Sequence, residues 1–306
     1  MSVDDGPESE ADLPVLVLGR GVTALGVIRT LGRRGVRAYL VSENPGVLAR
    51  SRWYRAPPPG TGPLPTPDTL TERLESGVGL DEAVLIPCSD TWARSVAALP
   101  PRLAGPYPAS IPDAEVLATF LDKLRLGRRL DELDVPHPRT VEIHEARQLE
   151  TLDEELLSTG FLKPHHTDDF LRRFGVKAFS FRGLEEALER FRELEAAGLG
   201  AVVQEYIPGP ATSHVFLDGF MDRDGRVRGL LARRRLRMHP GDFGNSTVTR
   251  TIPLDEADTA PDHLQRLLTE MGFRGIFSAE FKQDARDGRF KLLEVNGRPW
   301  WYVEFA

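Results

Sequence analysis

The chain of 306 residues is 41% hydrophobic and 28% charged, and it carries a formal net charge of −7. These values exclude collagen-like and wholly disordered proteins, and they fit two or three packed subdomains. Residues 1–12 hold five acids and no base, so the remainder is nearly neutral, which argues against a surface that coats nucleic acid.

The sequence also lacks the marks of a membrane or secreted protein. No run of about 18 apolar residues is present to span a bilayer, and the acidic N-terminus does not resemble a signal peptide. The lone cysteine, Cys88, excludes an internal disulfide and a cysteine-based zinc site, and we interpret it as a small packed residue. We therefore expect a cytoplasmic protein that binds neither nucleic acid nor membrane, with a disordered acidic tail over residues 1–12.

The first predicted elements form a β-α-β unit. A strand of buried type at 13–18 leads into a glycine-rich turn at 19–26, a helix and a second strand at 36–41. This order implies a parallel, doubly wound sheet. The region is completed by an irregular Pro- and Gly-rich connection at 56–67, a helix at 69–76 and a strand at 83–87.

The rest of the chain alternates between helical and strand patterns. Helices are predicted from about residue 113 and at 126–133, 146–157, 184–197 and 261–271. Strands are predicted at 140–143, 160–163, 176–181, 201–207, 213–221, 227–235, 276–283 and 290–295.

The glycine turn at 19–26 is compatible with a phosphate site, because glycines let backbone N–H groups approach a ligand at a helix N-terminus. The spacing is G-x-G-x-x-x-x-G, which departs from the dinucleotide fingerprint, although Glu43 lies where a ribose-binding acid would follow the second strand. Close packing of strand and helix explains the glycines equally well. An NAD(P)-dependent oxidoreductase therefore stays as an alternative.

The C-terminal hairpin carries the strongest chemical pattern. Side chains alternate along a strand, so Glu294 and Asn296 face the same way, and Glu280 comes opposite Glu294 if the two strands pair. Two carboxylates and an amide oxygen suit Mg²⁺ bound together with nucleotide phosphates. Arg298 follows directly and is placed to neutralise the charge of a transferring phosphoryl group.

Lysine is scarce in this chain. Arg and Lys together number 39, yet only five are lysines. Because a lysine is a compact point charge that arginine does not replace at a tight site, each lysine position is a candidate functional position. The five are Lys123, Lys163, Lys177, Lys282 and Lys291.

The hairpin sequence from Glu280 to Arg298, EFKQDARDGRFKLLEVNGR, closely resembles the metal-binding end of the ATP-grasp superfamily. Other motifs of that superfamily follow one another in the expected order over about residues 13–306, and within it the chain is most similar to carboxylate–amine ligases of the D-aspartate ligase kind. These motifs are Asp122-Lys123, FLKP at 161–164, QEYIPG at 204–209, and the basic strand 231–237 followed by GDFG at 241–244.

The resemblance implies an α/β ATP-grasp fold preceded by a doubly wound, Rossmann-like pre-ATP-grasp domain. The implied domains are 13–115 for the Rossmann-like part, 116–208 for the lid with its linker helices, and 209–306 for the C-terminal catalytic part. The implied activity is ATP-dependent ligation of a carboxylate to an amine through an acyl phosphate, with release of ADP and phosphate. The implied cofactors are ATP and two Mg²⁺ ions, with Mn²⁺ as a substitute.

The resemblance also implies roles for individual residues. Lys123 and Lys163 would contact the ATP phosphates, and Gln204, Glu205, Tyr206 and Ile207 would hold adenine, with the Gln204 and Glu205 side chains at its amino edge. Lys282 is a further candidate for contact with the nucleotide. The metal ligands would be Glu280, Glu294 and Asn296, and the cations at the reacting phosphoryl group would be Arg298, Arg235 and Arg237.

Two departures from the family pattern leave questions open. No acid follows the QEYIPG segment until Asp218, so the ribose-binding residue is unassigned. Related proteins usually continue beyond the position of Ala306, so we expect either a truncated chain, which could lack part of the amine site, or a short natural form. A non-catalytic ATP-binding subunit is therefore a second alternative. The substrates are unidentified beyond small carboxylates and amines such as amino acids, and a homodimer is the ordinary oligomeric expectation.

Overall fold

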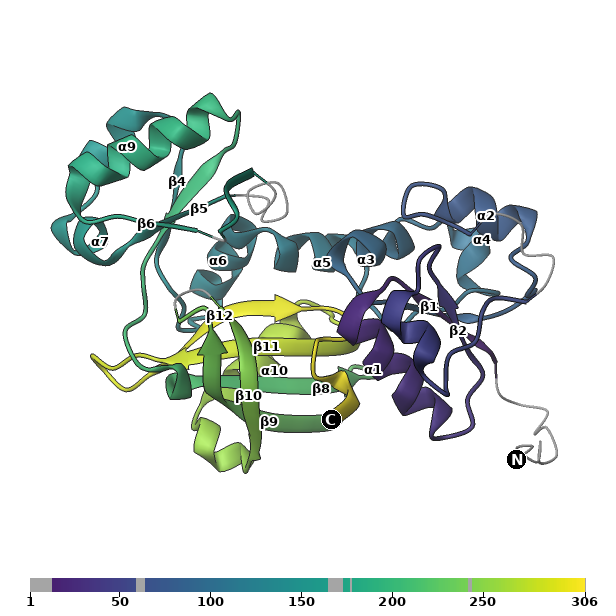
Figure 1. Cartoon of the computed structure of the whole chain (residues 1–306). Coiled ribbons are helices and arrows are strands. Elements are labelled where there is room, and N and C mark those ends of the chain that lie inside the picture. The colour runs from purple at the N-terminus through teal and green to yellow at the C-terminus, as the bar shows by residue number, and fades with distance from the viewer. Residues whose placement is uncertain (1–12, 59–63, 165–172, 177, 242–243, 306) are drawn as a thin grey trace.

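The computed structural model describes residues 13–58, 64–164, 173–176, 178–241 and 244–305 (Figure 1). The predicted tail at 1–12 and the middle of the GDFG loop lie outside these residues. The described chain forms three sheets, of three, four and five strands. None of the described helices is long and apolar enough to cross a membrane.

The N-terminal sheet has the predicted β-α-β core. β1 (Val15–Leu18) lies between β2 (Ala38–Val41) and β3 (Val84–Pro87), and both neighbours run parallel to it. α1 (Gly21–Gly32) connects β1 to β2. The turn before α1 requires glycine, because Gly19 has φ +127° and a Cβ atom there would lie 3.3 Å from the Trp92 ring.

Several short elements surround this sheet, and among them only the helix at 70–76 was predicted. α3 begins at Asp90, directly after β3, because the Ser89 hydroxyl accepts a hydrogen bond from the Trp92 N–H at 3.3 Å and so caps the helix. The strand end at residues 88–90 is therefore also a helix start. The short elements are η1 (Gly46–Arg50), α2 (Leu70–Ser76), α3 (Asp90–Ala97) and α4 (Pro101–Ala104).

Two consecutive helices, α5 (Ala114–Leu121) and α6 (Lys123–Glu132), lead away from the N-terminal sheet. Asp122 separates them and caps α6, since its carboxylate accepts hydrogen bonds from the backbone N–H groups of Leu124 and Arg125. Their apolar faces belong to the core of the five-stranded sheet, where Phe120 contacts Phe273. These helices, which the implied domain division assigns to the lid as linker helices, thus pack against the C-terminal part.

The lid is a four-stranded antiparallel sheet in the order β4-β7-β5-β6, with α7 and α9 packed against it (Figure 1). The predicted helix at 146–157 is split, because Asp153 starts a new helix by accepting a hydrogen bond from the Leu156 N–H. The elements are β4 (Thr140–Ile143), η2 (Ala146–Thr151), α7 (Glu154–Thr159), β5 (Phe161–Pro164), β6 (Phe179–Ser180), α9 (Gly183–Ala196) and β7 (Ala201–Gln204).

The C-terminal sheet is antiparallel, with the order β10-β9-β8-β11-β12. Its β10 was not predicted, and β9 extends four residues beyond the predicted end at residue 235. The elements are η3 (Ala211–Ser213), β8 (His214–Met221), β9 (Val227–His239), β10 (Asn245–Ile252), η4 (Leu254–Ala257), α10 (Ala260–Glu270), β11 (Gly275–Gln283), β12 (Phe290–Asn296) and η5 (Val303–Phe305).

The register of this sheet aligns one row of side chains across its strands. Arg233 pairs with Phe216, Phe216 with Glu280, and Glu280 with Glu294. Because α5, α6 and α10 contribute apolar side chains to the core on one face of the sheet, the alternate side chains of this row face the opposite side. That side is open toward the lid and carries the polar residues of the candidate site.

Candidate active site

A cavity of about 410 Å³ lies where the lid strands, the segment after β7 and the C-terminal sheet meet. Eleven of the thirteen predicted site residues line it: Lys163, Gln204, Glu205, Tyr206, Ile207, Arg235, Glu280, Lys282, Glu294, Asn296 and Arg298. The two that do not line it are Lys123 and Arg237. Residues from separate predicted motifs are thus brought to one place.

Lys123 lies beside the cavity, at the first position of α6. Burial and the positive charge of Lys163 together lower the pKa of Lys123 to about 8, against the opposing charges of Glu294 and Asp122. Two lysines therefore approach one another closely enough to interact. Two neighbouring cations suit a multiply charged anion.

Arg237 is not brought to the cavity, although it shares a strand face with Arg235. Its side chain is exposed, and its Nε donates a hydrogen bond to the Thr247 hydroxyl at 3.2 Å. The pairing of β9 with β10 is irregular at this point, where Arg237 pairs with Val248. Arg233, two residues before Arg235, lines the cavity instead.

The predicted carboxylate pair is in register, because Glu280 on β11 pairs with Glu294 on β12. His214 Nδ1 lies 2.6 Å and Arg235 Nη2 lies 3.0 Å from the same Glu280 oxygen, Oε1. Burial alone would raise the pKa of Glu280, but the hydrogen bond from His214 and the charge of Arg235 outweigh it and lower the pKa. Glu280 is therefore held as a carboxylate, and its Oε2 has no hydrogen-bond or ion-pair partner within the described chain.

These residues fit a hard divalent cation. Asn296 Nδ2 donates to Glu294 Oε1 at 3.2 Å, which leaves the amide oxygen of Asn296 and the second oxygen of Glu294 available on the strand that pairs with Glu280. All the available donors are oxygens, as Mg²⁺ prefers. Over the described ranges, no three His, Cys, Asp or Glu side chains gather as a metal site, so a cation here needs further oxygens from a ligand such as a phosphate chain.

The segment after β7 presents a free backbone edge. The Glu205 N–H donates to the Arg139 carbonyl at 2.8 Å, so this donor is already used. The Gln204 amide nitrogen donates to the Thr140 hydroxyl at 2.9 Å and is also used. The Glu205 carbonyl and the Ile207 N–H have no hydrogen-bond partner among the residues described, and they are the groups left to pair with a planar ring.

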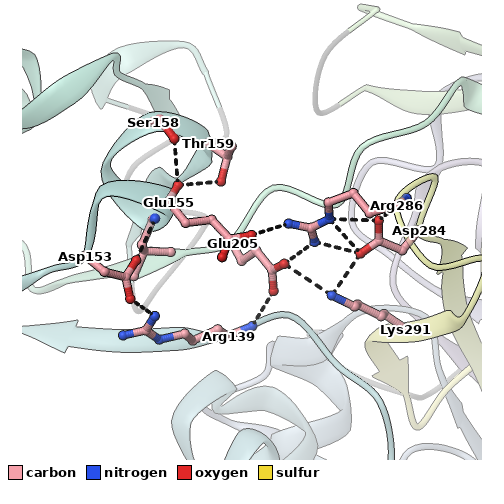
Figure 2. A network of polar contacts seen from close by, with 10 residues as sticks. Arg139, Asp153, Glu155, Ser158, Thr159, Glu205, Asp284, Arg286 and Lys291 are labelled. Atoms are coloured by element: carbon pink, nitrogen blue, oxygen red, sulfur yellow. Dashed lines mark hydrogen bonds and ion pairs between the residues drawn. The ribbon is translucent and has the colours of Figure 1, made fainter.

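The Glu205 carboxylate does not point to that edge as expected; it lies in an ion-pair network (Figure 2). Its Oε1 contacts Arg286 and lies 3.2 Å from Lys291 Nζ, and its Oε2 accepts from the Arg139 N–H at 3.0 Å. Lys291 also lies 2.9 Å from Asp284. Burial of Glu205 would raise its pKa, but these bonds outweigh burial and lower it. The charged partners on the β11–β12 hairpin thus set the side-chain direction.

Arg286 extends the same network to the lid. Its guanidinium contacts Asp284 on the hairpin, Glu205 after β7, and Glu155 on α7 at 2.8 Å (Figure 2). One side chain therefore joins the C-terminal sheet, the connecting segment and the lid.

Arg298 joins the cavity to the N-terminal sheet. Its Nε donates to Asp90 Oδ1 at 2.6 Å. Burial would lower the pKa of Arg298, but the charge of Asp90 and its hydrogen bond outweigh burial and raise it. Nearby, burial raises the pKa of the Cys88 thiol to about 12, so the thiol stays protonated at neutral pH, in agreement with its interpretation as a packed residue.

Lys282 was predicted as a site residue, but its position over the Tyr206 ring, 4.6 Å from the centroid, was not.

The structure also places residues in the cavity that the sequence did not single out. The only sequence signal for Arg233 is that it lies two residues before Arg235 on the same strand and therefore on the same face. Further unpredicted residues that line the cavity are Phe216, Arg233, Asn245, Ser246, Ser278, Trp300, Trp301 and Tyr302.

Comparison with known proteins gives one curated relative in sequence, while no family model matches. The relative is D-aspartate ligase of Enterococcus faecium (strain Aus0004), which is 25% identical over 225 residues, or 70% of this chain and 53% of that protein. The chain thus spans about half the length of the curated relative.

Solved structures agree on the fold. An L-amino acid ligase from Bacillus licheniformis matches with a TM-score of 0.65 and 16% identity, over 95% of this chain and 68% of that one. The biotin carboxylase domain of 2-oxoglutarate carboxylase from Hydrogenobacter thermophilus, in complex with MgADP, ADP and bicarbonate, matches with a TM-score of 0.65 and 16% identity, over 95% of this chain and 65% of that one. This likeness confirms the predicted α/β ATP-grasp fold, and in sequence the chain is similar to D-aspartate ligase.

Proposed function

We propose that this protein is an ATP-dependent carboxylate–amine ligase that forms an amide bond through an acyl phosphate. The observation that carries the proposal is the in-register pair of Glu280 and Glu294, with Asn296 beside it, on the wall of a cavity that also holds cations from four separate segments. The D-aspartate ligase relationship supports the ligase class. The substrates in this proposal are small, with amino acids as the first candidates.

The nucleotide would lie between the lid, over residues 116–208, and the C-terminal sheet, over residues 209–306. The Glu205 carbonyl and the Ile207 N–H would pair with the adenine ring, since other donors of that segment are engaged. Lys123 and Lys163, which lie close enough for the charge of one to lower the pKa of the other, would contact the negatively charged phosphates. Lys282, held against the Tyr206 ring, is a third cation within the cavity.

The proposed reaction has two steps. An oxygen of the substrate carboxylate attacks the γ-phosphorus of ATP, the bond from that phosphorus to the β–γ bridging oxygen breaks, and ADP leaves. The amine nitrogen then attacks the acyl carbon, the carbon–oxygen bond to phosphate breaks, phosphate leaves, and the nitrogen loses a proton. Both steps need positioning and charge neutralisation more than covalent participation of the protein.

The chain's own residues would meet these needs. Arg298, oriented by Asp90, would neutralise charge on the transferring phosphoryl group, and Arg235 would do so from β9. Glu280, Glu294 and Asn296 would hold Mg²⁺, which, when bound, neutralises phosphate charge. The N-terminal part, over residues 13–115, would complete the acceptor side of the site, because Asp90 follows the carboxyl end of β3.

Nucleotide turnover tests the proposal directly. The protein is mixed with Mg-ATP and a pool of amino acids and small carboxylates, and ADP is resolved from AMP. We expect ADP and phosphate that increase only when the pool is present. Formation of AMP would overturn the acyl-phosphate mechanism, and tight ATP binding without any stimulated turnover would favour a non-catalytic ATP-binding subunit instead.

A further inference from the structure

The two carboxylates of the proposed metal site are held very differently. Oε1 of Glu280 has two partners, because His214 Nδ1 lies 2.6 Å and Arg235 Nη2 lies 3.0 Å from it. Glu294 is exposed, and its Oε1 accepts one hydrogen bond, from Asn296 Nδ2 at 3.2 Å. Glu280 is therefore the more firmly oriented carboxylate of the pair.

The register of the sheet brings His214 to Glu280. Glu280 on β11 pairs with Phe216 on β8, and His214 lies two residues before Phe216 on that strand. Residues two apart on a strand share a face, and diagonal neighbours on adjacent strands lie within reach of long side chains. Two paired strands, rather than a loop, thus place the imidazole beside the carboxylate.

Neither partner can readily leave Glu280. His214 is 7% and Arg235 is 5% exposed. Arg235 Nε also donates to the Ser246 hydroxyl at 2.7 Å, and the guanidinium lies 5.0 Å from the centroid of the Phe216 ring. Because a carboxylate accepts hydrogen bonds and does not donate them, the histidine proton in this contact lies on Nδ1. Two buried donors therefore anchor Oε1 of Glu280.

Anchoring one oxygen fixes the direction of the other. Oε2 of Glu280 has no hydrogen-bond or ion-pair partner among the residues that the structure describes, so it is the oxygen left for a cation. Mg²⁺ demands near-ideal octahedral geometry, whereas Ca²⁺ accepts a larger and more variable set of oxygens and often takes both oxygens of one carboxylate. A carboxylate that offers one oxygen in one fixed direction favours the smaller ion.

We propose that His214 is a positioning residue that makes the metal site selective for Mg²⁺ over Ca²⁺. It acts through Glu280, because its Nδ1–H holds Oε1 and leaves Oε2 to the cation. The inference rests on the metal ligands of the proposed function. Groups that orient a metal ligand typically contribute about 10–100-fold to metal affinity, and the flexible coordination of Ca²⁺ depends less on that orientation.

Three variants and a matched control separate the hydrogen bond from the shape of the ring. His214→Phe keeps a ring and removes the donor, and His214→Leu removes both. His214→Asn keeps a donor, because the Asn amide nitrogen, like Nδ1 of histidine, is bonded to Cγ. The control is His144→Phe, at an exposed histidine outside the cavity whose Nε2 lies 3.4 Å from Glu142.

The measurement is metal binding and needs no turnover. Each protein is mixed with ADP and Mn²⁺, protein-bound Mn²⁺ is determined by electron paramagnetic resonance against ADP and Mn²⁺ alone, and Mg²⁺ or Ca²⁺ is added as competitor. We expect the wild type to bind Mg²⁺ more tightly than Ca²⁺. His214→Phe and His214→Leu should weaken Mg²⁺ binding by about tenfold and Ca²⁺ binding by less than about threefold. His214→Asn and His144→Phe should keep the wild-type ratio of the two affinities.

Three results would overturn the inference and leave the proposed ligase function intact. They are equal affinity of the wild type for Mg²⁺ and Ca²⁺, an unchanged affinity ratio in the two variants that lack the donor, and a ratio in His214→Asn that falls as far as in His214→Phe. Circular dichroism checks that each variant is folded, and either donor-lacking variant suffices for the comparison. If the wild type binds no Mn²⁺ with ADP, the metal assignment in the proposed function fails as well.

Discussion

Arg298 Nε donates a hydrogen bond to Asp90 Oδ1 at 2.6 Å, although the two residues are 208 positions apart in the chain. Arg298 follows the end of β12 in the C-terminal sheet, and Asp90 begins α3 beside the N-terminal sheet. The contact orients the cation that we place at the transferring phosphoryl group. The N-terminal part is therefore connected to the site by a charged contact as well as by packing.

Replacing Asp90 with Asn should lower kcat by about 100-fold, because the Arg298 guanidinium loses the charge that orients it and small misplacements of a catalytic group are costly. Stability should change by only about 1 kcal/mol or less, since both side chains are partly exposed. Steady-state kinetics and thermal unfolding check the two parts. The exposed Asp81 offers the control Asp81→Asn, and equal kinetics of the two variants would remove Asp90 from this role.

Replacing Glu294 with Gln should abolish ADP formation and leave the fold intact. The amide keeps the shape of the side chain but removes one of the two carboxylate charges that face the proposed cation. ADP release with the substrate pool, and circular dichroism, are the measurements. Turnover above a tenth of the wild-type rate would exclude Glu294 as a metal ligand. Glu256→Gln, at an acid on η4 away from the cavity, controls for loss of charge.

ATP affinity should fall as pH rises above about 8, the pKa of Lys123 in the free protein. The lowered pKa means that the folded state releases this proton before the unfolded state does. Between pH 8 and the ordinary lysine pKa of about 10.4, the unfolded state binds more protons than the folded state, so the contribution of Lys123 to stability rises with pH. Over the same range Lys123 loses the positive charge that it offers to the ATP phosphates. Calorimetric ATP titrations from pH 7 to 10 measure the affinity.

Lys163→Met should weaken ATP binding at pH 7 and should shift its alkaline decrease to higher pH. The positive charge of Lys163 is one cause of the lowered Lys123 pKa, so its removal lets that pKa rise. Arg128→Met removes a cation from the exposed side of α6 and should alter neither quantity. Unchanged ATP affinity in Lys163→Met would count against the assignment of the lid lysine.

Arg286→Gln should raise the KM for ATP several-fold and reduce stability at pH 7 by about 1 kcal/mol. Arg286 joins Glu205, Asp284 and Glu155, so its loss frees both the segment that we propose binds adenine and the lid (Figure 2). The bonds from Arg286 and Lys291 outweigh burial and lower the pKa of Asp284 and of Glu205.

The pH dependence of this variant has a definite sign. Carboxylates with lowered pKa contribute stability that is present above their unfolded pKa of about 4 and is lost as the pH falls through their folded pKa. The stability difference between wild type and Arg286→Gln should therefore shrink below pH 4. Urea unfolding from pH 7 to 3 measures it, with Arg289→Gln on the same hairpin as the control. A constant difference would show that the network is not the cause.

Local sequence patterns determined much of this protein. The β-α-β unit was visible because a strand of apolar residues, a glycine turn and a helix follow one another within 13–41. The pairing of Glu280 with Glu294 was also visible, because a hairpin with period-two alternation sets which side chains share a face. The missed β10 is a polar edge strand, NSTVTRTI, whose pattern gives little hydrophobic signal.

Only the tertiary structure decided the contacts between distant segments. The sequence placed Glu205 at the adenine edge, yet Arg286 and Lys291 draw its carboxylate to the hairpin. The sequence could not show that Asp90 accepts a hydrogen bond from Arg298. Nor could it show that Arg233 donates to Asp218 while its Nη1 has no partner among the described residues. Local patterns report which face a side chain occupies, but charges separated along the chain come together only when whole elements pack, and that packing depends on the complete fold.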